Sequence, residues 1–367
     1  MNTPVVEHLY LHIPFCAKVC PYCSFYVHGG GVGKQERFVE ALVREIQAAK
    51  VTWNLKTIFI GGGTPSMLSA PLFSRIAEAL PALGGVGEFT LEVNPATVTD
   101  KKVEAWKKGG VTRISLGVQS FRDPELKLLG RQHSSNQACQ TYHELRDYGF
   151  KNLNIDLIFG LPDQNADHWR ETLEIATSLL PNHLSAYQLT YEEDTPFFEK
   201  VSTGAIVPNE FQRQEMFEIT EEILNRVDLQ RYEISNFALL GNESKHNQAY
   251  WSGKNYLGFG PSAVSTIDSS RWTNFPDTEA YIQSMMSLGV PQREREEITA
   301  EIFWKERVML GLRTREGVAK TLFNSLPEHL ITLEKLVEEG HLQERGDSWV
   351  LTAQGQLVAD SIAQSFF

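Results

Sequence analysis

The sequence lacks any run of about 18 consecutive apolar residues, the length that a membrane-spanning helix requires. Its first residues, MNTPVVEHLY, also lack the basic segment and the apolar segment of a secretory signal. Segments of low complexity and repeats of short period are absent as well. These absences predict a cytoplasmic protein whose thiols stay reduced.

Positive charge is in short supply, since 34 lysines and arginines are set against 46 aspartates and glutamates and give a net charge of −12. This balance disfavours a general role on nucleic acid or on an anionic membrane, although a local basic patch could still allow peripheral membrane association. The 42% hydrophobic and 22% charged residues are ordinary for a soluble globular protein. At 367 residues the chain is long enough for one large domain and one or two smaller ones.

Cysteine is also scarce, and three of the four cysteines lie close together with the spacing C-x3-C-x2-C. Cys16, Cys20 and Cys23 are an odd number for a disulfide framework and one short of the usual structural zinc site. We interpret Cys139, which lies in an expected helix, as a small buried side chain or a neutral surface thiol. Three thiolates can instead bind three irons of a 4Fe-4S cube and leave the fourth iron open, whereas electron-transfer clusters mostly use four cysteines.

Short β-branched and aliphatic runs alternate with amphipathic helical segments in the first half of the chain. This alternation predicts a parallel sheet, and six such units over about 190 residues predict a partial (β/α)6 barrel of the TIM type. Helices are expected at 36–49, 70–83 and 168–180. Strands are expected at 8–14, 56–62, 89–95, 113–121, 152–162 and 183–191.

Polar or glycine-rich segments follow every expected strand: the cysteines, GGGTP, EVNP, GVQSF, DLIFGLP and QLTYEEDTP. Active sites of β/α barrels lie at the C-terminal ends of the strands, so these segments predict one shared site at the barrel mouth. The alternative is that they are ordinary polar loops. The glycines of GGGTP would let the backbone approach a ligand closely, and the alternative for them is a plain tight turn.

The pattern changes after residue 192, which divides the chain into three expected domains. A barrel with the cofactor sites is expected at 1–200, and an extension with irregular Gly-, Asn- and aromatic-rich sequence at 201–293. The remaining residues, 294–367, combine helical segments, one of them at 315–323, with two short β runs around a Gly-Asp turn. This combination predicts a small winged-helix-like domain, and its acidic character favours a structural or docking role over DNA binding.

The cysteine motif, with Tyr22 before its last cysteine and GGGTP after the second strand, resembles the radical S-adenosylmethionine (SAM) superfamily. The resemblance implies that Cys16, Cys20 and Cys23 ligate a 4Fe-4S cluster whose open iron binds the amino and carboxylate groups of SAM. It implies that electron transfer into the sulfonium releases a 5′-deoxyadenosyl radical. A zinc or redox protein without SAM is the alternative, and GGGTP and EVNP fit it poorly.

Over nearly the whole chain, YLHIPFCAKVCPYC, GGGTPS, EVNP, GVQSF, GRQH and NIDLIFGLP resemble the oxygen-independent coproporphyrinogen oxidases, a branch of this superfamily. The structural alternative for Arg131 and Asp156 is a salt bridge across the barrel mouth, although arginine suits a ligand carboxylate and a carboxylate suits ribose hydroxyls or an ammonium. The resemblance implies a second SAM held by Gln119, Arg131 and Asp156. It implies contacts with the cluster-bound SAM from Tyr10, Tyr22, Gly62, Gly63, Thr64 and Glu92.

Two features depart from these oxidases, which carry a further cysteine two residues after the third and a longer N-terminal arm. This chain has Phe25 at that position and only fifteen residues before Cys16. YEISNFA (232–238) and HNQAYW (246–251) instead resemble the HNxxYW signature of the HemW-type heme chaperones. The resemblance therefore implies a heme chaperone with a three-cysteine 4Fe-4S cluster, exchangeable SAM and heme as cofactors. The alternative is a radical SAM coproporphyrinogen III dehydrogenase.

The HNxxYW segment has a chemistry of its own. The imidazole of His246 could ligate heme iron, and Tyr250 and Trp251 offer flat apolar surface to a porphyrin. The alternative is a packing cluster in which His246 is only hydrogen-bonded, with other histidines available to the iron. A chaperone would need an acceptor protein and an electron donor for the cluster, and the sequence identifies neither. A monomer and a homodimer both remain open.

Overall fold

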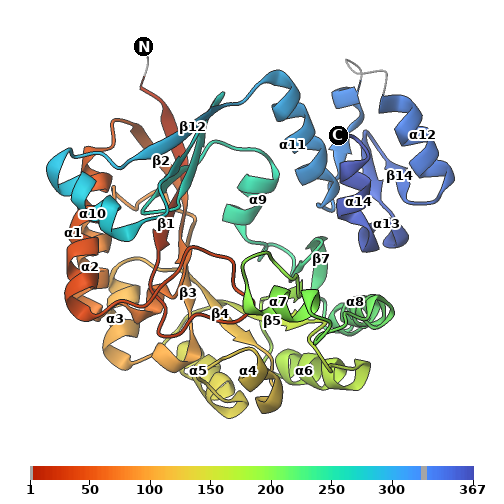
Figure 1. Cartoon of the computed structure of the whole chain (residues 1–367), viewed down its shortest axis with the longest axis horizontal. Coiled ribbons are helices and arrows are strands. Elements are labelled where there is room, and N and C mark those ends of the chain that lie inside the picture. Colours follow the sequence, from red (N-terminus) through yellow and green to blue (C-terminus); the bar gives the residue numbers. More distant parts are fainter. Residues whose placement is uncertain (1–2, 324–328) are drawn as a thin grey trace.

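The computed structural model describes residues 3–323 and 329–367, and its central element is a parallel sheet curved into a barrel (Figure 1). Six strands pair in sequence order, each parallel to the next, as the alternating pattern predicts. The predicted partial (β/α)6 barrel is thereby confirmed. Its strands are β1 (Val5–Ile13), β2 (Thr52–Gly62), β3 (Glu88–Val93), β4 (Arg113–Gln119), β5 (Asn152–Phe159) and β6 (His183–Gln188).

Three short strands extend this sheet at its two edges. β9 (Leu257–Phe259) runs parallel to β1, while β8 (Asn236–Ala238) and then β7 (Gln230–Glu233) add antiparallel beyond β6. Within the described residues the edge strands β7 and β9 do not pair with each other, so the barrel stays open. The sequence between 231 and 265 has no clean periodicity, which is why these strands were not predicted.

Helices cover the outer face of the barrel, and apolar residues at helical spacing explain how they attach. In α1, Phe38, Leu42 and Ile46 are buried, and they lie three to four residues apart on one face. Side chains of Ser134 and Asn165 cap the N-termini of α5 and α6. The helices are α1 (Val32–Ala48), α2 (Ala70–Ala79), α3 (Asp100–Lys108), α4 (Asp123–Leu128), α5 (Ser135–Asp147), α6 (Ala166–Ser178), α7 (Pro196–Ser202) and α8 (Glu210–Asn225), with 3-10 turns η1 (Pro65–Met67) and η2 (Pro95–Thr97).

One continuous apolar core lies between the sheet and these helices, and it contains residues from both sides of position 200. Met216 of α8, Phe237 of β8, Phe259 of β9 and Met285 pack into the same core as the barrel strands. The division of residues 1–200 from 201–293 stays a prediction, and the two segments share their apolar core.

A second sheet lies against the open side of the barrel. Its antiparallel strands follow α9 (Lys245–Trp251) in the chain and enclose α10 (Thr278–Ser287), which packs on α1. The strands are β10 (Val264–Ile267), β11 (Ser270–Asn274) and β12 (Arg293–Glu297). β12 leads directly into the C-terminal module (Figure 1).

The C-terminal module has its own core, formed by Trp304, Val308, Phe323, Leu336 and other apolar residues. The predicted hairpin around Gly346 is present, and β13 joins it to make a three-stranded sheet. The helix expected at 315–323 is wrong, because Gly317 has a φ of +72° and Val318 pairs with Trp349 as a strand. The elements are α11 (Ala300–Leu312), β13 (Val318–Ala319), η3 (Lys320–Phe323), α12 (Leu330–Glu338), β14 (Leu342–Arg345), β15 (Ser348–Leu351), α13 (Ala353–Leu357) and α14 (Ala359–Gln364).

None of the helices within residues 3–323 and 329–367 combines the length and the apolar character needed to cross a bilayer.

Glu45 on α1 connects the barrel to the second sheet through four hydrogen bonds. Its side chain is 3% exposed and accepts from the Gly260 N–H (2.9 Å) and the Tyr281 hydroxyl (2.7 Å). It also accepts from Asn274 Nδ2 (3.0 Å) and Arg293 Nη2 (3.1 Å). A buried carboxylate with this many donors is costly to replace, because the donors would lose their partner.

We therefore expect Glu45→Gln to lower the free energy of unfolding by about 2–3 kcal/mol, since an amide cannot accept from all four donors. The matched control is Glu40→Gln on the same helix, whose side chain is 43% exposed and pairs only with Arg44. The control should change stability by less than about 0.5 kcal/mol. Urea unfolding followed by circular dichroism measures both, and equal midpoints for the two variants would refute the assignment.

Candidate functional site

The cysteines lie on a loop that leaves β1 and returns to its own start. The His28 N–H donates to the Pro14 carbonyl (2.8 Å), and the Cys16 N–H donates to the His28 carbonyl (3.0 Å). The Phe15 ring packs edge-on against His28 and Phe38, with centroid distances of 5.4 and 5.1 Å. These contacts close the base of the loop, so its three cysteines are presented from a fixed frame.

The three thiols are half-buried and face polar groups from the strand ends. Cys16 Sγ lies 3.5 Å from Thr64 Oγ1, and Cys20 Sγ lies 3.9 Å from Arg131 Nη1. Burial raises the pKa of Cys16 and of Cys23, and each of these thiols is further influenced by Cys20. Because burial favours the neutral thiols, a bound metal would be needed to hold all three as thiolates.

A single metal ion does not fit this arrangement. In the described part of the chain, no three His, Cys, Asp or Glu side chains converge closely enough to hold one ion. A zinc site requires sulfur within about 2.3 Å of the metal, which brings its ligands much closer together. Three thiols spread along one loop, with no fourth cysteine beside them, fit a polynuclear iron–sulfur cluster with an open iron.

The glycine segment at the end of β2 joins the cysteine loop through the backbone. The Gly63 N–H donates to the Ile13 carbonyl (2.8 Å), and the Thr64 N–H donates to the Phe15 carbonyl (2.8 Å). A Cβ on Gly63 would lie 2.7 Å from the Phe15 carbonyl oxygen, and Gly62 has a φ of +108°. Larger residues are therefore excluded here, and the backbone is left exposed to a ligand at the mouth.

Two carboxylates lie inside the barrel beside these glycines. Glu92 accepts from the Gly62 N–H (3.2 Å), and burial together with the nearby Asp156 raises the pKa of Glu92 to about 8. Asp156 accepts from Ser115 Oγ (2.8 Å) and Asn154 Nδ2 (2.7 Å), and burial raises its pKa. Neighbouring buried carboxylates favour a cationic or hydroxyl-bearing ligand, which would relieve their mutual repulsion.

Gln119 and Arg131 stand at the end of β4. Gln119 has a φ of +74° at a bulge in the strand, an uncommon conformation for a residue with a side chain. Arg131 donates from Nη2 to the Gly117 carbonyl (2.6 Å), and its buried Nε has no partner among the described residues. The alternative of a salt bridge between Arg131 and Asp156 finds no support within residues 3–323 and 329–367.

Tyr10 lies on β1 before the cysteine loop, and Tyr22 lies within that loop. The Tyr10 hydroxyl bonds His12 Nδ1 (3.1 Å), while Tyr22 packs against Phe197 at 6.4 Å between ring centroids. Burial raises the pKa of both phenols, so both stay neutral and can donate a hydrogen bond. The structure thus brings the cysteines together with Tyr10, Tyr22, Thr64, Glu92 and Arg131 at one mouth.

The HNxxYW segment forms α9, which Glu88 fixes to the start of β3. The Glu88 carboxylate accepts from the backbone N–H groups of Lys245 and His246 (both 3.0 Å), at the N-terminus of the helix. Tyr250 lies at the other end of the helix beside Tyr256, with ring centroids 4.6 Å apart. The Arg313 guanidinium lies 5.6 Å from the ring centroid of Trp251, so the last residue of the motif contacts the C-terminal module.

His246 is placed differently from what a heme ligand requires. It is 1% exposed, its Nδ1 bonds Thr57 Oγ1 (2.7 Å), and its Nε2 bonds the Tyr250 hydroxyl (2.9 Å). Burial lowers its pKa to about 3, so the imidazole stays neutral. Both ring nitrogens are engaged, and the structure favours the alternative in which His246 is a packing residue that orients Tyr250.

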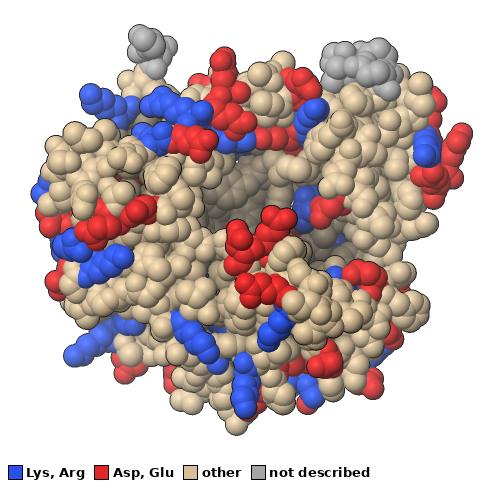
Figure 2. All heavy atoms as spheres, viewed as in Figure 1, with Lys and Arg blue, Asp and Glu red and all other residues tan. Residues whose placement is uncertain are grey.

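A cavity of about 1010 Å3 opens between the barrel, the second sheet and α11. Figure 2 shows a hollow in the face of the molecule where Figure 1 draws α9, with acidic side chains along its lower edge. Phe25 of the cysteine loop is 68% exposed and lines this cavity together with Tyr10 and Tyr250. The cluster loop and the HNxxYW helix therefore form walls of the same space.

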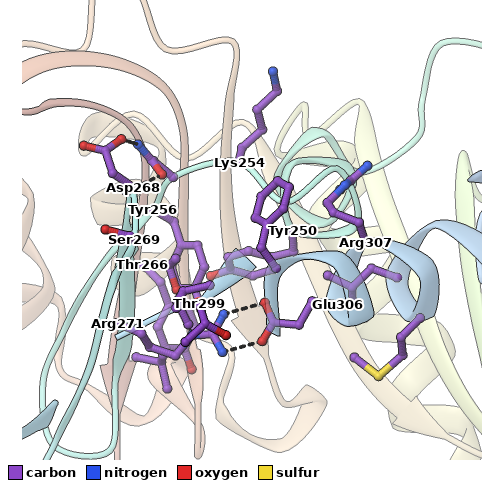
Figure 3. A pocket seen from close by; sticks show the side chains of 18 of the residues that line it. Tyr250, Lys254, Tyr256, Thr266, Asp268, Ser269, Arg271, Thr299, Glu306 and Arg307 are labelled. Atoms are coloured by element: carbon purple, nitrogen blue, oxygen red, sulfur yellow. Dashed lines mark hydrogen bonds and ion pairs between the residues drawn. The ribbon is translucent and has the colours of Figure 1, made fainter. Parts of the chain in front are cut away.

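The sequence did not predict several of the residues that line this cavity. Lys254 and Tyr256 follow the HNxxYW motif, while Arg271 and Arg307 come from β11 and α11 (Figure 3). No spacing joins these segments in the sequence. The run KNY two residues after HNQAYW was the available signal, because a cation near an aromatic residue suits a flat anionic ligand.

The barrel, its three-cysteine loop and the glycine segment are those of a radical SAM protein. The model of the Radical SAM superfamily matches residues 10–176, and that of the HemN C-terminal domain matches residues 298–358. Coproporphyrinogen III oxidase (HemN) from Escherichia coli superposes over 100% of this chain and 90% of its own with a TM-score of 0.85. At 23% identity, this match confirms the fold alone.

Similar proteins of known name show which family within this superfamily the chain belongs to. The heme chaperone HemW of Bacillus subtilis is 35% identical over 98% of this chain and 99% of its own length. The heme chaperone HemW of Escherichia coli is 32% identical over 98% of this chain and 97% of its own length. The chain belongs to the HemW family, as its HNQAYW and YEISNFA segments predicted. Membership of the radical SAM superfamily implies a 4Fe-4S cluster and SAM as cofactors.

The ligand assignment makes a direct prediction for the cluster. Cys16→Ala should abolish the 4Fe-4S absorbance and the bound iron and sulfide after anaerobic reconstitution, because two thiolates do not hold the cube. The matched control is Cys139→Ala, since Cys139 is a half-buried thiol on α5 that packs against the barrel core. Its cluster should be intact. A cluster that persists in the Cys16 variant would show that the assignment is wrong.

Proposed function

We propose that this protein is a heme chaperone, which binds heme in the cavity beside its cluster loop and transfers it to an acceptor protein. The single observation that carries the proposal is the 1010 Å3 cavity shared by the cysteine loop, the HNxxYW helix and α11. Small-molecule sites span about 300–1,000 Å3, so this space accepts a ligand of cofactor size. The name heme chaperone, borne by curated relatives at 30–35% identity, supports the same function.

The walls of the cavity suit a porphyrin. Aromatic side chains of Tyr10, Phe25, Tyr26, Tyr250 and Tyr256 line it, and they offer flat apolar surface to a flat ring. Tyr250 is held at its hydroxyl by His246, and Tyr256 packs across it. An aromatic wall that is fixed before binding loses little conformational entropy when the ligand enters.

The cofactors are proposed to lie at the barrel mouth, next to this cavity. Cys16, Cys20 and Cys23 would hold the 4Fe-4S cluster, and its open iron would bind SAM. When bound, the pair supplies one-electron reduction of the sulfonium of SAM. Gly62, Gly63 and Thr64 would present backbone and hydroxyl groups to that SAM, Tyr10 and Tyr22 would flank it, and Glu92 would face its ammonium.

A second SAM at Gln119, Arg131 and Asp156 has a physical basis in the same geometry. Arg131 has an unpartnered Nε within the described residues, and the Asp156 carboxylate lies inside the barrel. The arginine would take a ligand carboxylate, and the aspartate would take ribose hydroxyls or an ammonium. Whether one or two SAM molecules bind is decided by counting SAM per cluster at equilibrium.

Phe25 favours the chaperone over the coproporphyrinogen III dehydrogenase. Its backbone N–H interacts with the Cys23 thiol, and its exposed ring forms part of the cavity wall. The position that resembles a cysteine site in the oxidases is thus an apolar surface for a ligand in this chain. We place the protein in the cytoplasm with an electron donor for the cluster, and we assign residues 294–367 a docking role toward the acceptor.

The decisive experiment combines two assays on one anaerobically reconstituted sample. Hemin titration followed by absorbance should give stoichiometric binding, while coproporphyrinogen III incubated with SAM and a reductant should yield no protoporphyrinogen. Leu310→Trp, which fills the cavity from α11, should weaken hemin binding at least tenfold. Val337→Trp on α12 is the matched control outside the cavity. Multiple turnover of coproporphyrinogen would overturn the proposal.

We expect His246 to contribute to stability and not to the binding of heme iron. His246→Ala should lower the free energy of unfolding by about 2–4 kcal/mol, because it leaves a cavity and removes the partner of Thr57 and Tyr250. The absorbance spectrum of bound heme should be unchanged, since neither ring nitrogen is free for iron. His143→Ala, at an exposed histidine on α5, is the control and should change neither quantity. A changed heme spectrum in the His246 variant alone would make His246 the axial ligand.

A further inference from the structure

The cavity offers iron no free histidine or cysteine among its lining residues. No cysteine is among its lining residues, all of which lie in the described part of the chain, and its one histidine is His12. His12 Nδ1 bonds the Tyr10 hydroxyl (3.1 Å), and its Nε2 bonds the Tyr26 carbonyl (2.9 Å). Met309 and four tyrosines also line the cavity, and thioether and phenol groups can bind heme iron. The hydroxyls of Tyr10, Tyr26 and Tyr250 are each hydrogen-bonded within the protein. With no free imidazole or thiolate for the iron, recognition of a heme in this space can come largely from contacts with the rest of the ligand.

Some charged side chains of the cavity are paired within the protein, and others are not. Arg271 is neutralised by Glu306 through two hydrogen bonds (2.5 and 2.8 Å), and Asp268 accepts from Asn255 Nδ2 (2.9 Å). Lys254 and Arg307 have no carboxylate partner among the residues that the structure describes. Two cations are thus left available in a mostly apolar space.

These two cations come from neighbouring segments of the cavity wall. The position of a Cβ on Gly253 would be 2.9 Å from Arg307 Nη1, and Lys254 is the next residue in the chain. Figure 3 shows Lys254 and Arg307 at the upper edge of the drawn side chains, with the Lys254 ammonium pointing away from Tyr256 and Arg271. Arg307 uses Nη1 to bond the Trp251 carbonyl (3.1 Å), so its other N–H groups can bind a ligand.

Arg307 also destabilises the protein when no ligand is bound. It is half-buried, and burial lowers its pKa. A cation removed from water without a carboxylate partner is destabilising, and an anionic ligand at this place would offset the cost. Arginine binds carboxylates in a bidentate manner, which fixes the orientation of the ligand as well.

We propose that Lys254 and Arg307 bind the two propionates of heme while the porphyrin ring lies against Tyr250 and Tyr256. The site then recognises a porphyrin dicarboxylate rather than its iron, and this inference rests on the heme-chaperone function proposed above. Two free cations match the two carboxylates of heme, whereas the four carboxylates of coproporphyrinogen would leave two without partners. An iron without a strong protein ligand is also free to accept one from the next protein.

Three ligands test the proposal on the reconstituted full-length protein: hemin, hemin dimethyl ester and metal-free protoporphyrin IX. The wild type should bind the dimethyl ester at least tenfold more weakly than hemin, because esterification removes both charges. It should bind protoporphyrin IX within about fivefold of hemin, because the iron contributes little. Fluorescence quenching and absorbance titration provide the dissociation constants.

Two variants assign the effect to residues. Lys254→Gln and Arg307→Gln should each weaken hemin binding about tenfold and leave the affinity for the dimethyl ester unchanged. Arg307→Lys should recover part of the loss. Lys245→Gln, at the exposed start of α9, and Arg44→Gln on α1 are the matched controls and should bind all three ligands as the wild type does.

The outcomes separate this inference from the function on which it rests. Hemin binding that is insensitive to esterification and to both glutamine variants would overturn the propionate site and leave the chaperone function standing. A loss above a hundredfold on removal of the iron would identify an iron ligand as the main contact and would also overturn it. No hemin binding by the wild type would overturn the chaperone function itself. If Arg307→Gln fails to fold, the ester comparison on the wild type and Lys254→Gln still decide.

Discussion

The parallel pairing of β1 with β2 is the constraint on which the site depends. It continues past the ends of both strands, where the Gly63 and Thr64 N–H groups donate to the carbonyls of Ile13 and Phe15. Only glycine fits at position 63, because a Cβ there would clash with the Phe15 carbonyl. The base of the cysteine loop is therefore fixed by sheet hydrogen bonds, although the loop itself has no regular structure. Further contacts within the loop, such as the hydrogen bond from the Cys16 N–H to the His28 carbonyl, then hold the thiols near the mouth of the barrel.

The same two strands also position the cavity. β1 carries Tyr10 and His12, which line the cavity before the chain enters the cysteine loop, and β2 carries Thr57, which bonds His246. His8 bonds the same Thr57 hydroxyl (2.8 Å), so a buried chain of polar groups ties α9 to this strand pair. Each member of such a chain is satisfied by its neighbours, which makes it rigid and specific. The cysteine loop and the aromatic side chains of the cavity are thus both positioned by β1 and β2.

The sequence predicts the parts of this architecture that are local. The strand–helix alternation, the cysteine loop and the C-terminal hairpin are each encoded within a few tens of residues. The strands β7, β8 and β9 could not be predicted, because they are three or four residues long and owe their existence to distant partners. The role of His246 depends on Thr57, 189 positions earlier, and the cavity joins segments around residues 10, 25, 254, 271 and 307. Only tertiary structure brings such groups together.

Helix α11 links the cavity to the C-terminal module, because its two faces serve different cores. Trp304, Val308 and Leu312 point into the core of the module, while Phe303, Arg307 and Leu310 line the cavity. The two sets follow helical spacing and lie on opposite sides of one short helix. The module is further tied to the barrel by the Ile234 N–H, which donates to the Arg313 carbonyl (3.0 Å). A ligand that packs against α11 would thereby contact the same element that joins the module to the barrel, so the proposed heme and the proposed acceptor would both act on one helix.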